Sequence, residues 1–461
     1  MNSYNQQFAD SSGNSRTIDV QSFIDGRKMS RFQITIAIIC IAVLVLDGFD
    51  SGMIAYVAPA LATELHLLPA QMGPLFAAGL AGLTIGAFVG VAVADRIGRK
   101  KVLLGTVAMF GGFTLLALLF RDFSSIVALR FGVGLGLGGA GPVAMALIAE
   151  TCPFSKRSRL LAYLGCGIPV GGIIAGAVAT RLIPTHGWHS MFIVGGGLPI
   201  LLLLAIAFRV PESVRFLLLR RGGQERVRQI IQKMAPDQNL ADAHFWVKQV
   251  VKASRAPMVD LFHTAPPAST AFLWLASFST MIVISFVSNW LPILLQSAHR
   301  LMSETSLLLS LFLFGSPCGS LLIGVLMDKY NRYVCLFTSA LIGALGLVAI
   351  GNIVGQTLPT GLIIAVLGAA CGACFTGAGI LASFIYPTSV RATGIGWTIG
   401  CGRLGSVLGS MTGTFFLSLG VSLPSLLKIA SVPCFVAFGA FVGMFLIARK
   451  RTELTTLAEF P

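Results

Sequence analysis

Charged residues are scarce in this sequence of 461 residues, where Asp, Glu, Lys and Arg together make up 11%. An average soluble domain carries roughly 25%. Hydrophobic residues account for 55% of the chain, so a soluble fold would have too little polar surface to stay dispersed. A nucleic-acid-binding protein is excluded as well, because its basic residues would come with a polar surface. The composition therefore indicates a protein with several membrane spans.

Motifs for enzyme chemistry are missing too. The chain has no P-loop, no HExxH, no cluster of zinc ligands and no nucleophile elbow. Gly134, Gly136 and Gly139 make a GxGxxG pattern, but neither the preceding strand nor the βαβ unit of a dinucleotide site accompanies it. The nine cysteines lie mostly in apolar segments, which predicts packing rather than a disulfide framework, also for Cys371 and Cys374. We expect no enzyme, no metal and no cofactor.

Long apolar runs are what the sequence does contain. A membrane helix needs about 20 apolar residues, and a chain of this length has room for roughly a dozen. The runs are continuous and do not alternate, which argues against a β-barrel. The sequence therefore predicts an all-α membrane protein with twelve helices. The predicted spans are 33–58, 73–94, 102–120, 123–148, 159–181, 189–208, 270–296, 305–327, 333–354, 359–385, 392–419 and 426–448.

One long polar stretch divides the chain into two halves of six spans. Asp95-Arg96 after the second span recurs as Asp328-Lys329 after the eighth, and Arg157 before the fifth span recurs as Arg391 before the eleventh. An internal repeat of six spans is typical of secondary transporters. The predicted parts are a disordered cytoplasmic tail (1–32), a six-helix bundle (33–208), a cytoplasmic linker (209–269), a second six-helix bundle (270–448) and a cytoplasmic tail (449–461).

The distribution of the 33 basic residues predicts the orientation. Arg130 and Arg403 lie inside spans. Arg121, Arg181, Arg300 and Lys428 fall in the loops of one side, and all the others fall on the opposite side. Basic loops stay in the cytoplasm, so both termini are expected there. The net charge of +15 is then a signal of topology and says little about partners.

Two carboxylates lie within the first span. Asp47 and Asp50 are three residues apart and share a helix face. Ionisable residues inside a membrane usually face the bundle interior and mark a pathway. We expect the pair to load and release a coupling proton. The alternative is a structural pair that holds helices together.

The two arginines inside spans carry the complementary charge, one in each half. Arginine stays charged when it is buried and grips a carboxylate through two hydrogen bonds. Arg130 and Arg403 are therefore candidates for binding an anionic substrate. Arg130 has a second possible role, which is to pair with an aspartate of the first span. The sequence leaves open which arginine holds substrate and which acts on the Asp pair.

Several motifs resemble those of a known family. Residues 90–101 read GVAVADRIGRKK, which is similar to the signature between spans 2 and 3 of the major facilitator superfamily, with the glycine one position early. Arg130, Gly134, Gly136, Gly138 and Pro142 resemble the span-4 motif of its proton-coupled members. Further matches are Asp47-Gly-Phe-Asp50, Pro211-Glu-Ser213, Asn289-Trp-Leu-Pro292, Tyr386-Pro387 and Gly402-Arg403-Leu-Gly405. Together they resemble the aromatic acid:proton symporter family.

This resemblance implies a function. It implies a symporter that imports benzoate-type or hydroxybenzoate-type acids with protons across the bacterial inner membrane by alternating access. The partners would be a small aromatic carboxylate, protons and the lipid bilayer, with no nucleic acid, and we expect a monomer. Two alternatives are an exporter of organic anions or drugs on the same fold and a non-transporting membrane sensor.

The candidate residues fall into two further groups. The substrate-binding candidates combine cations, an amide and rings that could stack on a benzene ring. They are Arg130, Arg403, Asn289, Trp290, Trp397 and Phe49. Asn289 and Trp290 precede Pro292, where we expect a broken or kinked helix. The conformational candidates brace the loops: Asp95, Arg96, Gly98, Arg99, Glu150, Asp328 and Arg391.

Overall fold

The computed structural model describes residues 16–218, 223–236, 238, 240, 243–247, 261, 267–297, 300–353, 357–387 and 390–458. The first half contains six long helices joined by short turns. These are α2 (Arg31–Glu64), α3 (Gly73–Ile97), α4 (Arg99–Leu116), α5 (Phe123–Thr151), α6 (Phe154–His186) and α7 (His189–Arg209), with 3-10 turns at Pro69–Met72 and Ala117–Leu119.

The second half repeats this plan. Its long helices are α11 (Pro267–Ser297), α12 (Met302–Lys329), α13 (Arg332–Ile353), α14 (Thr357–Ile385), α15 (Arg391–Ser418) and α17 (Val432–Ala458), and α16 (Leu423–Ile429) is a short helix before α17. Eleven helices within the described residues are long and apolar enough to cross a membrane. The twelfth long helix, α15, is rich in Gly, Ser and Thr and contains Arg403, which makes it less apolar.

Glycines bring α3 and α5 into close contact. A Cβ on Gly134 would lie 2.1 Å from the carbonyl oxygen of Gly79, and one on Gly138 would lie 2.1 Å from that of Leu83. Helices that pack in lipid gain from such close backbone approach. Gly315 and Gly319 of α12 approach α14 in the same way, and they follow Gly82 and Gly86 of α3 at the interval that separates Asp95 from Asp328. The repeat inferred from two sequence matches therefore extends to helix packing.

This packing makes a prediction about stability. We expect Gly138→Ala to destabilise the protein by about 1–3 kcal/mol, because the added methyl group would force α3 and α5 apart. Thermal unfolding in detergent measures the effect. Gly141→Ala is the matched control on the same helix, since a Cβ there meets nothing within 4 Å. Equal unfolding temperatures for the two variants would contradict this account of the α3–α5 contact.

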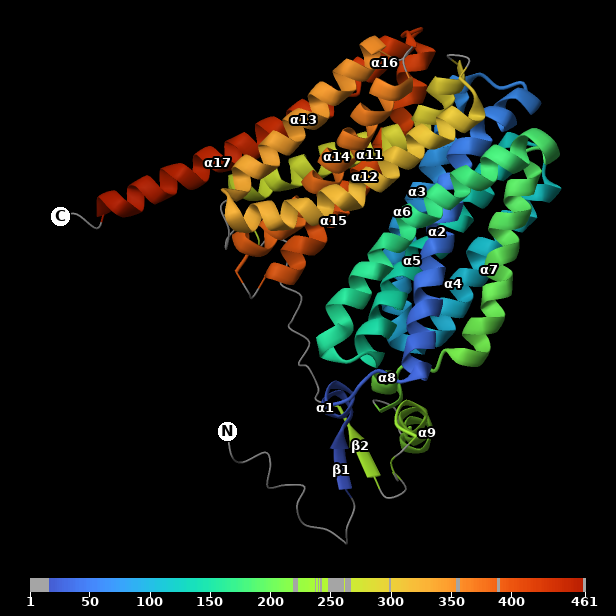
Figure 1. Ribbon diagram of the computed structural model, residues 1–461, viewed down its shortest axis with the longest axis vertical. Helices are drawn as coiled ribbons and strands as arrows, with labels where there is room; N and C mark the ends of the chain where they lie inside the picture. Colours follow the sequence, from blue (N-terminus) through green and yellow to red (C-terminus); the bar gives the residue numbers. More distant parts are fainter. Residues whose placement is uncertain are drawn as a thin grey trace.

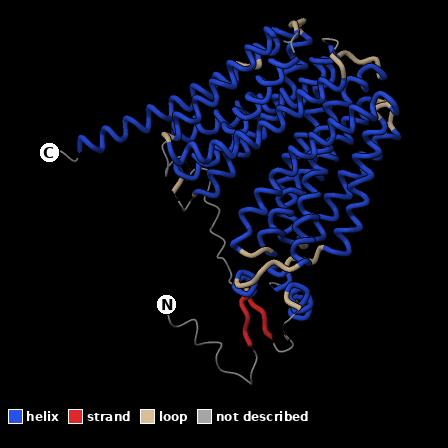
Figure 2. Tube along the Cα trace, viewed as in Figure 1, coloured by secondary structure: helices blue, strands red, loops and turns tan. Residues whose placement is uncertain are grey.

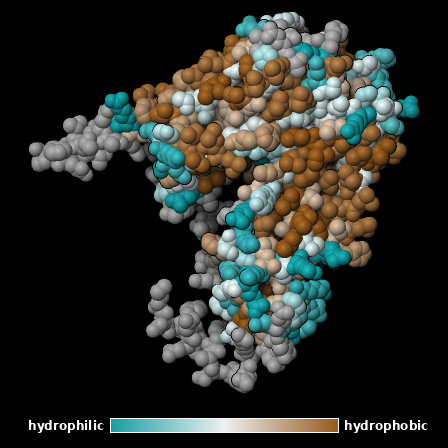
Figure 3. All heavy atoms as spheres, viewed as in Figure 1, coloured by the Kyte–Doolittle hydropathy of each residue, from teal (hydrophilic) through white to brown (hydrophobic). Residues whose placement is uncertain are grey.

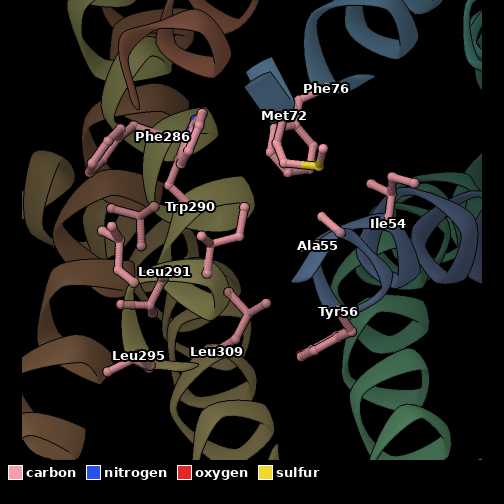
Figure 4. Packing of buried hydrophobic residues seen from close by; sticks show 14 of the residues in the cluster. Ile54, Ala55, Tyr56, Met72, Phe76, Phe286, Trp290, Leu291, Leu295 and Leu309 are labelled. Carbon is pink, nitrogen blue, oxygen red and sulfur yellow. The ribbon is translucent and has the colours of Figure 1, made fainter. Parts of the chain in front are cut away.

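The two bundles meet at one end and diverge toward the other (Figure 1). At the closed end, Trp290 and Phe286 of α11 face Phe76 of α3 and Ile54 of α2 across the boundary (Figure 4). The rings of Phe76 and Trp290 meet edge to face with centroids 5.7 Å apart. We call the end at which the bundles diverge the linker end, because the segment between the bundles lies there.

A small domain at the linker end joins the start of the chain to the segment between the bundles (Figure 2). It contains β1 (Arg16–Asp19), α1 (Val20–Asp25), α8 (Val214–Leu218), α9 (Gln224–Met234) and β2 (Ala243–Trp246). The two strands pair in parallel, with Arg16 opposite Ala243 and Asp19 opposite Trp246. Apolar side chains from all five elements form its core.

The small domain differs from the sequence-based expectation of a disordered tail over 1–32, and it adds secondary structure to the segment 209–269, which was expected only as a polar cytoplasmic linker. Each element is too short to bury its apolar face alone, and the pairing joins segments more than 200 residues apart, so no local pattern reveals it. The domain is tied to the first bundle. The Asp25 carboxylate of α1 accepts the backbone N–H of Phe154 in α6 at 2.8 Å. Residues 1–15 of the predicted tail lie outside the described residues.

Two further expectations need correction. The last predicted span, 426–448, begins inside the separate helix α16, and α17 begins at Val432, next to Pro433, which favours a helix start. That helix continues to Ala458, into the predicted C-terminal tail. In addition, α11 is one continuous helix with Pro292 inside it, so the expected break is wrong, and the alternative of a kink stays a prediction. The nine cysteines are free, and Cys371 and Cys374 are buried, as predicted.

The surface agrees with a protein embedded in a bilayer. Apolar residues cover the sides of both bundles, and hydrophilic residues gather on the small domain and at the helix ends (Figure 3). Phe88, Phe208 and Leu321 are each more than 60% exposed. Apolar side chains that point outward over so much of the surface are stable where lipid surrounds them.

Candidate functional site

A buried ion pair joins α2 to α5 near the middle of the first bundle. The Arg130 guanidinium approaches Asp50 with Nη2 2.9 Å from Oδ2 and Nη1 3.2 Å from Oδ1. The Thr114 hydroxyl of α4 donates to the same Oδ1 at 3.0 Å. Asp50 is 0% exposed and Arg130 is 4% exposed. The pair places opposite charges next to each other, which offsets the cost of burying each of them alone.

Asp47 belongs to a different arrangement. Its carboxylate accepts one long hydrogen bond, from the Ser51 hydroxyl at 3.4 Å, and it interacts electrostatically with Arg403 of the second bundle. Arg403 Nη1 donates to the Leu83 backbone carbonyl of α3 at 3.2 Å. Residues three apart on a helix point about 60° apart, so one aspartate faces its own bundle and the other faces the boundary. Of the four charges singled out in the sequence, Asp50 and Arg130 form a direct ion pair, whereas Asp47 and Arg403 attract each other across the boundary without a direct ion pair.

A small cavity lies beside Arg130 at the boundary between the two bundles. Arg130, Ser51 and Asn289 supply its polar lining, and its apolar lining includes Phe76 and Leu83. Arg130 and Ser51 come from the first bundle and Asn289 from the second, so the cavity spans the boundary. Arg130 Nε is buried and has no hydrogen-bond partner among the described residues. The cavity thus combines a cationic donor, an amide and an aromatic wall.

The cavity volume in this conformation is about 40 Å³. That is enough for a water molecule, whereas a dry cavity that binds benzene measures about 150 Å³. An aromatic acid would fit only after the bundles move apart around Asn289 and Phe76. In this conformation the cavity therefore has room for a water molecule and not for a benzene ring.

The aromatic candidates lie in different surroundings. Trp290 is fully buried, and its indole N–H donates to the Ser410 carbonyl of α15 at 2.8 Å. Phe49 is 2% exposed within the packing of the first bundle. Trp397 is 41% exposed and stacks on Trp274, with ring centroids 5.7 Å apart. None of the three lines the central cavity in this conformation, whereas Asn289 does.

The loop between α3 and α4 forms a charged brace at the linker end. Arg99 Nη2 lies 3.3 Å from Asp95 Oδ1 and 3.2 Å from Glu150 Oε1, so one guanidinium joins three helices. Glu150 also accepts the Ser213 hydroxyl that follows α7. Glu150, one of the conformational candidates, thus contacts Arg99 at the start of α4, and its role in conformational change stays a prediction. The brace touches neither Asp47 nor Asp50.

Gly98 allows the tight turn in this brace. Its φ of 111° lies in the region that favours glycine, and a Cβ would sit 2.3 Å from Glu212 Oε2. Glu212 in turn accepts the Lys100 backbone N–H at 3.1 Å. The turn therefore connects α4 to the residues that follow α7.

The corresponding residues of the second half are not joined in this way. Asp328 is exposed at the end of α12, and Arg391 Nε donates to the Tyr386 carbonyl at 3.4 Å. Arg96 lies exposed at the end of α3. The structure therefore brings Asp95, Gly98, Arg99 and Glu150 together and places Asp328 and Arg391 apart from them.

Sequence reasoning missed Thr114 and Phe76 at the centre. Thr114 is one of two threonines in an otherwise apolar span, the other being Thr106, which is a weak signal for a partner of Asp50. Phe76 is one of 32 phenylalanines, and nothing local marks it as part of a cavity wall. Glu212 stands in a quoted motif, but its contact with Gly98 depends on how α7 ends.

The brace makes a second stability prediction. We expect Glu150→Ala to destabilise the protein by about 1.5–3 kcal/mol, because a half-buried carboxylate with two partners is lost. Chemical unfolding in detergent checks this. Glu225→Ala removes an exposed pair with Arg228 and should cost less than about 1 kcal/mol. Equal losses in the two variants would show that the brace does not stabilise the bundle.

Comparison with known proteins places this geometry in context. Residues 40–302 and 273–460 each match the family model of the Major Facilitator Superfamily. The chain is 34% identical to the 4-hydroxybenzoate transporter PcaK of Pseudomonas putida, over 92% of this chain and 94% of that protein. It is 34% identical to a gallate transporter of the same species, over 91% and 93%. It is 30% identical to a benzoate transport protein of Acinetobacter baylyi, over 91% and 92%.

Solved structures agree on the fold. The structure resembles a D-xylose-proton symporter with a TM-score of 0.69 and 18% identity, over 89% of this chain and 97% of that one. It also resembles a bacterial homologue of the human lysosomal transporter Spinster in an inward-facing conformation, with a TM-score of 0.67 and 16% identity, over 91% and 96%. At these identities the likeness concerns the fold alone.

Proposed function

Because the chain belongs to the major facilitator superfamily, where it groups with transporters of aromatic acids, we propose that it imports benzoate-type or hydroxybenzoate-type acids together with protons. It is a multi-pass membrane transporter and not an enzyme, and its bacterial relatives imply the inner membrane. The observation that carries the proposal is the pairing of Asp50 with Arg130 at a cavity that spans both bundles.

The substrate class follows from the cavity lining. A carboxylate pairs with a guanidinium, and a benzene ring packs against an apolar wall with an aromatic edge. Arg130 and Phe76 supply these two features on the first bundle, and Asn289 supplies an amide for a ring hydroxyl on the second. Three relatives are named for 4-hydroxybenzoate, gallate and benzoate. Each of these acids has one benzene ring and one carboxylate, which fits this lining.

The proton carrier we propose is Asp47. Its carboxylate can take a proton without breaking an ion pair within its own bundle, whereas Asp50 is held by Arg130 and Thr114. Neutral Asp47 would lose its attraction for Arg403 and so loosen one link across the boundary. In this proposal Arg130 contacts the substrate. Arg403 of the second bundle responds to the protonation of Asp47, because the attraction between the two side chains is then lost.

The linker end is the cytoplasmic end in this proposal. Arg121, Arg181, Arg300 and Lys428 lie at the closed end, and the other basic residues outside the bundle interior belong to the linker end or to the chain termini, in accord with the preference of basic loops for the cytoplasm. The bundles diverge toward the linker end, so the molecule has the shape of a carrier open to the cytoplasm (Figure 1). Rocking about the cavity would close this end and open the other.

Transport by purified protein tests the substrate class. We expect labelled 4-hydroxybenzoate to enter proteoliposomes and unlabelled benzoate to compete with it, whereas benzyl alcohol, which lacks the carboxylate, should not compete. Arg130→Gln should abolish uptake, because it removes the cation in the cavity. No uptake of any benzoate-like acid, or equal competition by the alcohol, would refute the proposal.

A further inference from the structure

A second cavity lies at the linker end, apart from the central site. It has a volume of about 790 Å³ and sits where α4 and α7 meet α9. Small-molecule sites typically measure about 300–1,000 Å³. Five basic residues and one acid belong to its lining: Lys100, Lys101, Arg209, Arg226, Lys233 and Glu212. Neither the brace nor the transport site explains this concentration of positive charge.

Two of these charged side chains, Lys100 and Glu212, already form hydrogen bonds with backbone groups of the protein. Lys100 Nζ donates to the Ala207 carbonyl at 2.6 Å, and Glu212 accepts the backbone N–H groups of Lys100 and Ser213. The other four bases are exposed, and no acidic side chain of the described residues pairs with them. Lys233 Nζ lies 6.0 Å from the centre of the Phe32 ring. The cavity therefore has several cationic hydrogen-bond donors, which favour an anionic ligand.

The cavity also has an apolar side. Leu104 of α4 and Phe208 of α7 belong to its lining, and Phe208 is 81% exposed at the end of a membrane-spanning helix. Apolar side chains at this level continue the lipid-facing surface of the bundle. A ligand that fills the cavity and continues onto this surface is anionic at one end and apolar at the other.

The small domain fixes the position of the two basic residues that α9 contributes to the cavity, Arg226 and Lys233. Val227, Ile231 and Met234 bury one face of α9 in the core of the domain. Gln224 at the start of α9 exchanges two hydrogen bonds with the backbone of Phe245 in β2, at 2.8 and 3.0 Å. Arg226 and Lys233 lie on the other face of this anchored helix, so their positions over the ends of α4 and α7 are fixed by packing.

We propose that this cavity binds the phosphate headgroup of an anionic phospholipid from the adjoining leaflet. Basic pockets beside membrane helices bind such headgroups, and each Lys or Arg near the surface contributes about 1 kcal/mol. The lipid phosphate lies among Lys101, Arg226 and Lys233, and its acyl chains run along Leu104 and Phe208. The lipid thereby fastens the small domain to the bilayer. This site is independent of the acid that is carried.

Native mass spectrometry of the full chain in detergent tests this site with phosphatidylglycerol and phosphatidylcholine as probes. We expect a preference for phosphatidylglycerol in the wild type. The triple variant Lys101→Gln, Arg226→Gln, Lys233→Gln should lose roughly a hundredfold in affinity, since about 1 kcal/mol per base corresponds to about fivefold each. These side chains are exposed or line an open cavity, so the variant should fold.

Two controls make the result specific. The charge-preserving variant Lys101→Arg, Arg226→Lys, Lys233→Arg should keep the preference. Lys156→Gln, Arg159→Gln, Lys450→Gln removes three exposed bases outside the cavity and should keep it as well. The proposal is overturned if the cavity variant binds phosphatidylglycerol as the wild type does. It is also overturned if the two lipids bind equally, or if inorganic phosphate competes as strongly as the lipid.

Discussion

Replacing Asp50 with Asn is expected to destabilise the protein by about 3–5 kcal/mol, because it leaves the Arg130 charge buried without its partner. Asparagine has nearly the same shape, so the loss comes from charge and not from a cavity. The Thr114 hydroxyl keeps an acceptor in the variant, which restricts the change to the ion pair. Thermal unfolding and gel filtration in detergent measure the loss of folded protein.

The double variant Asp50→Asn, Arg130→Gln separates the ion pair from the packing around it. Removing both charges should restore most of the stability, since neither an unpaired cation nor an unpaired anion remains. Asp95→Asn serves as a control, because this carboxylate is 49% exposed and its pair should contribute about 1 kcal/mol or less. A double variant as unstable as the single one would mean that the pairing is not what holds α2 to α5.

Replacing Asp47 with Asn is expected to uncouple transport from the proton gradient. A pH difference of one unit can support about a tenfold accumulation for each proton carried with the substrate. The wild type should approach that ratio in proteoliposomes, whereas Asp47→Asn should stop at equal concentrations inside and outside. Exchange of internal for external substrate needs no net proton movement, so the variant should still catalyse it.

The conservative variant Asp47→Glu provides the matched control. It keeps a carboxyl group beside Ser51 and Arg403, so it should retain accumulation in part. Accumulation by Asp47→Asn at the level of the wild type would exclude Asp47 as the proton carrier. Loss of exchange together with accumulation would instead indicate a role for Asp47 in substrate binding or in the movement of the bundles.

The sequence predicted the charged centre well because membrane spans tolerate few charges. Asp47, Asp50, Arg130 and Arg403 stood out against apolar surroundings, and the structure pairs Asp50 directly with Arg130 and places Asp47 within the electrostatic influence of Arg403. The sequence left open whether Arg130 binds substrate or an aspartate, and in this conformation it pairs with Asp50. Helix spacing placed the two aspartates on one face but could not assign their partners, which come from α4, α5 and α15.

The aromatic residues were harder to assign. Phe76 lines the cavity, but its sequence context matches that of many phenylalanines that face lipid. Trp290 was a candidate because its ring could stack on a benzene ring, yet it and its neighbour Asn289 point about 100° apart on the helix. As a result, Asn289 lines the cavity while Trp290 packs against Gly413 of α15. The position of each ring depends on contacts between bundles that the sequence does not contain.

The small domain could not be predicted from the sequence, and the reason is a different one. Its two strands have four residues each and lie at opposite ends of the first half of the chain. Such short strands form only when α9 and the start of the chain bury apolar surface together. Polar composition favoured a tail and a linker, and the few apolar residues that fold them are spread over both segments.

Uptake driven by an imposed pH gradient tests the central claim most directly. Proteoliposomes with the wild-type protein, labelled 4-hydroxybenzoate outside and no membrane potential are compared with and without an inward proton gradient. We expect accumulation above the external concentration only with the gradient, and a proton ionophore should abolish it. Uptake that is the same in both conditions would contradict proton-coupled import.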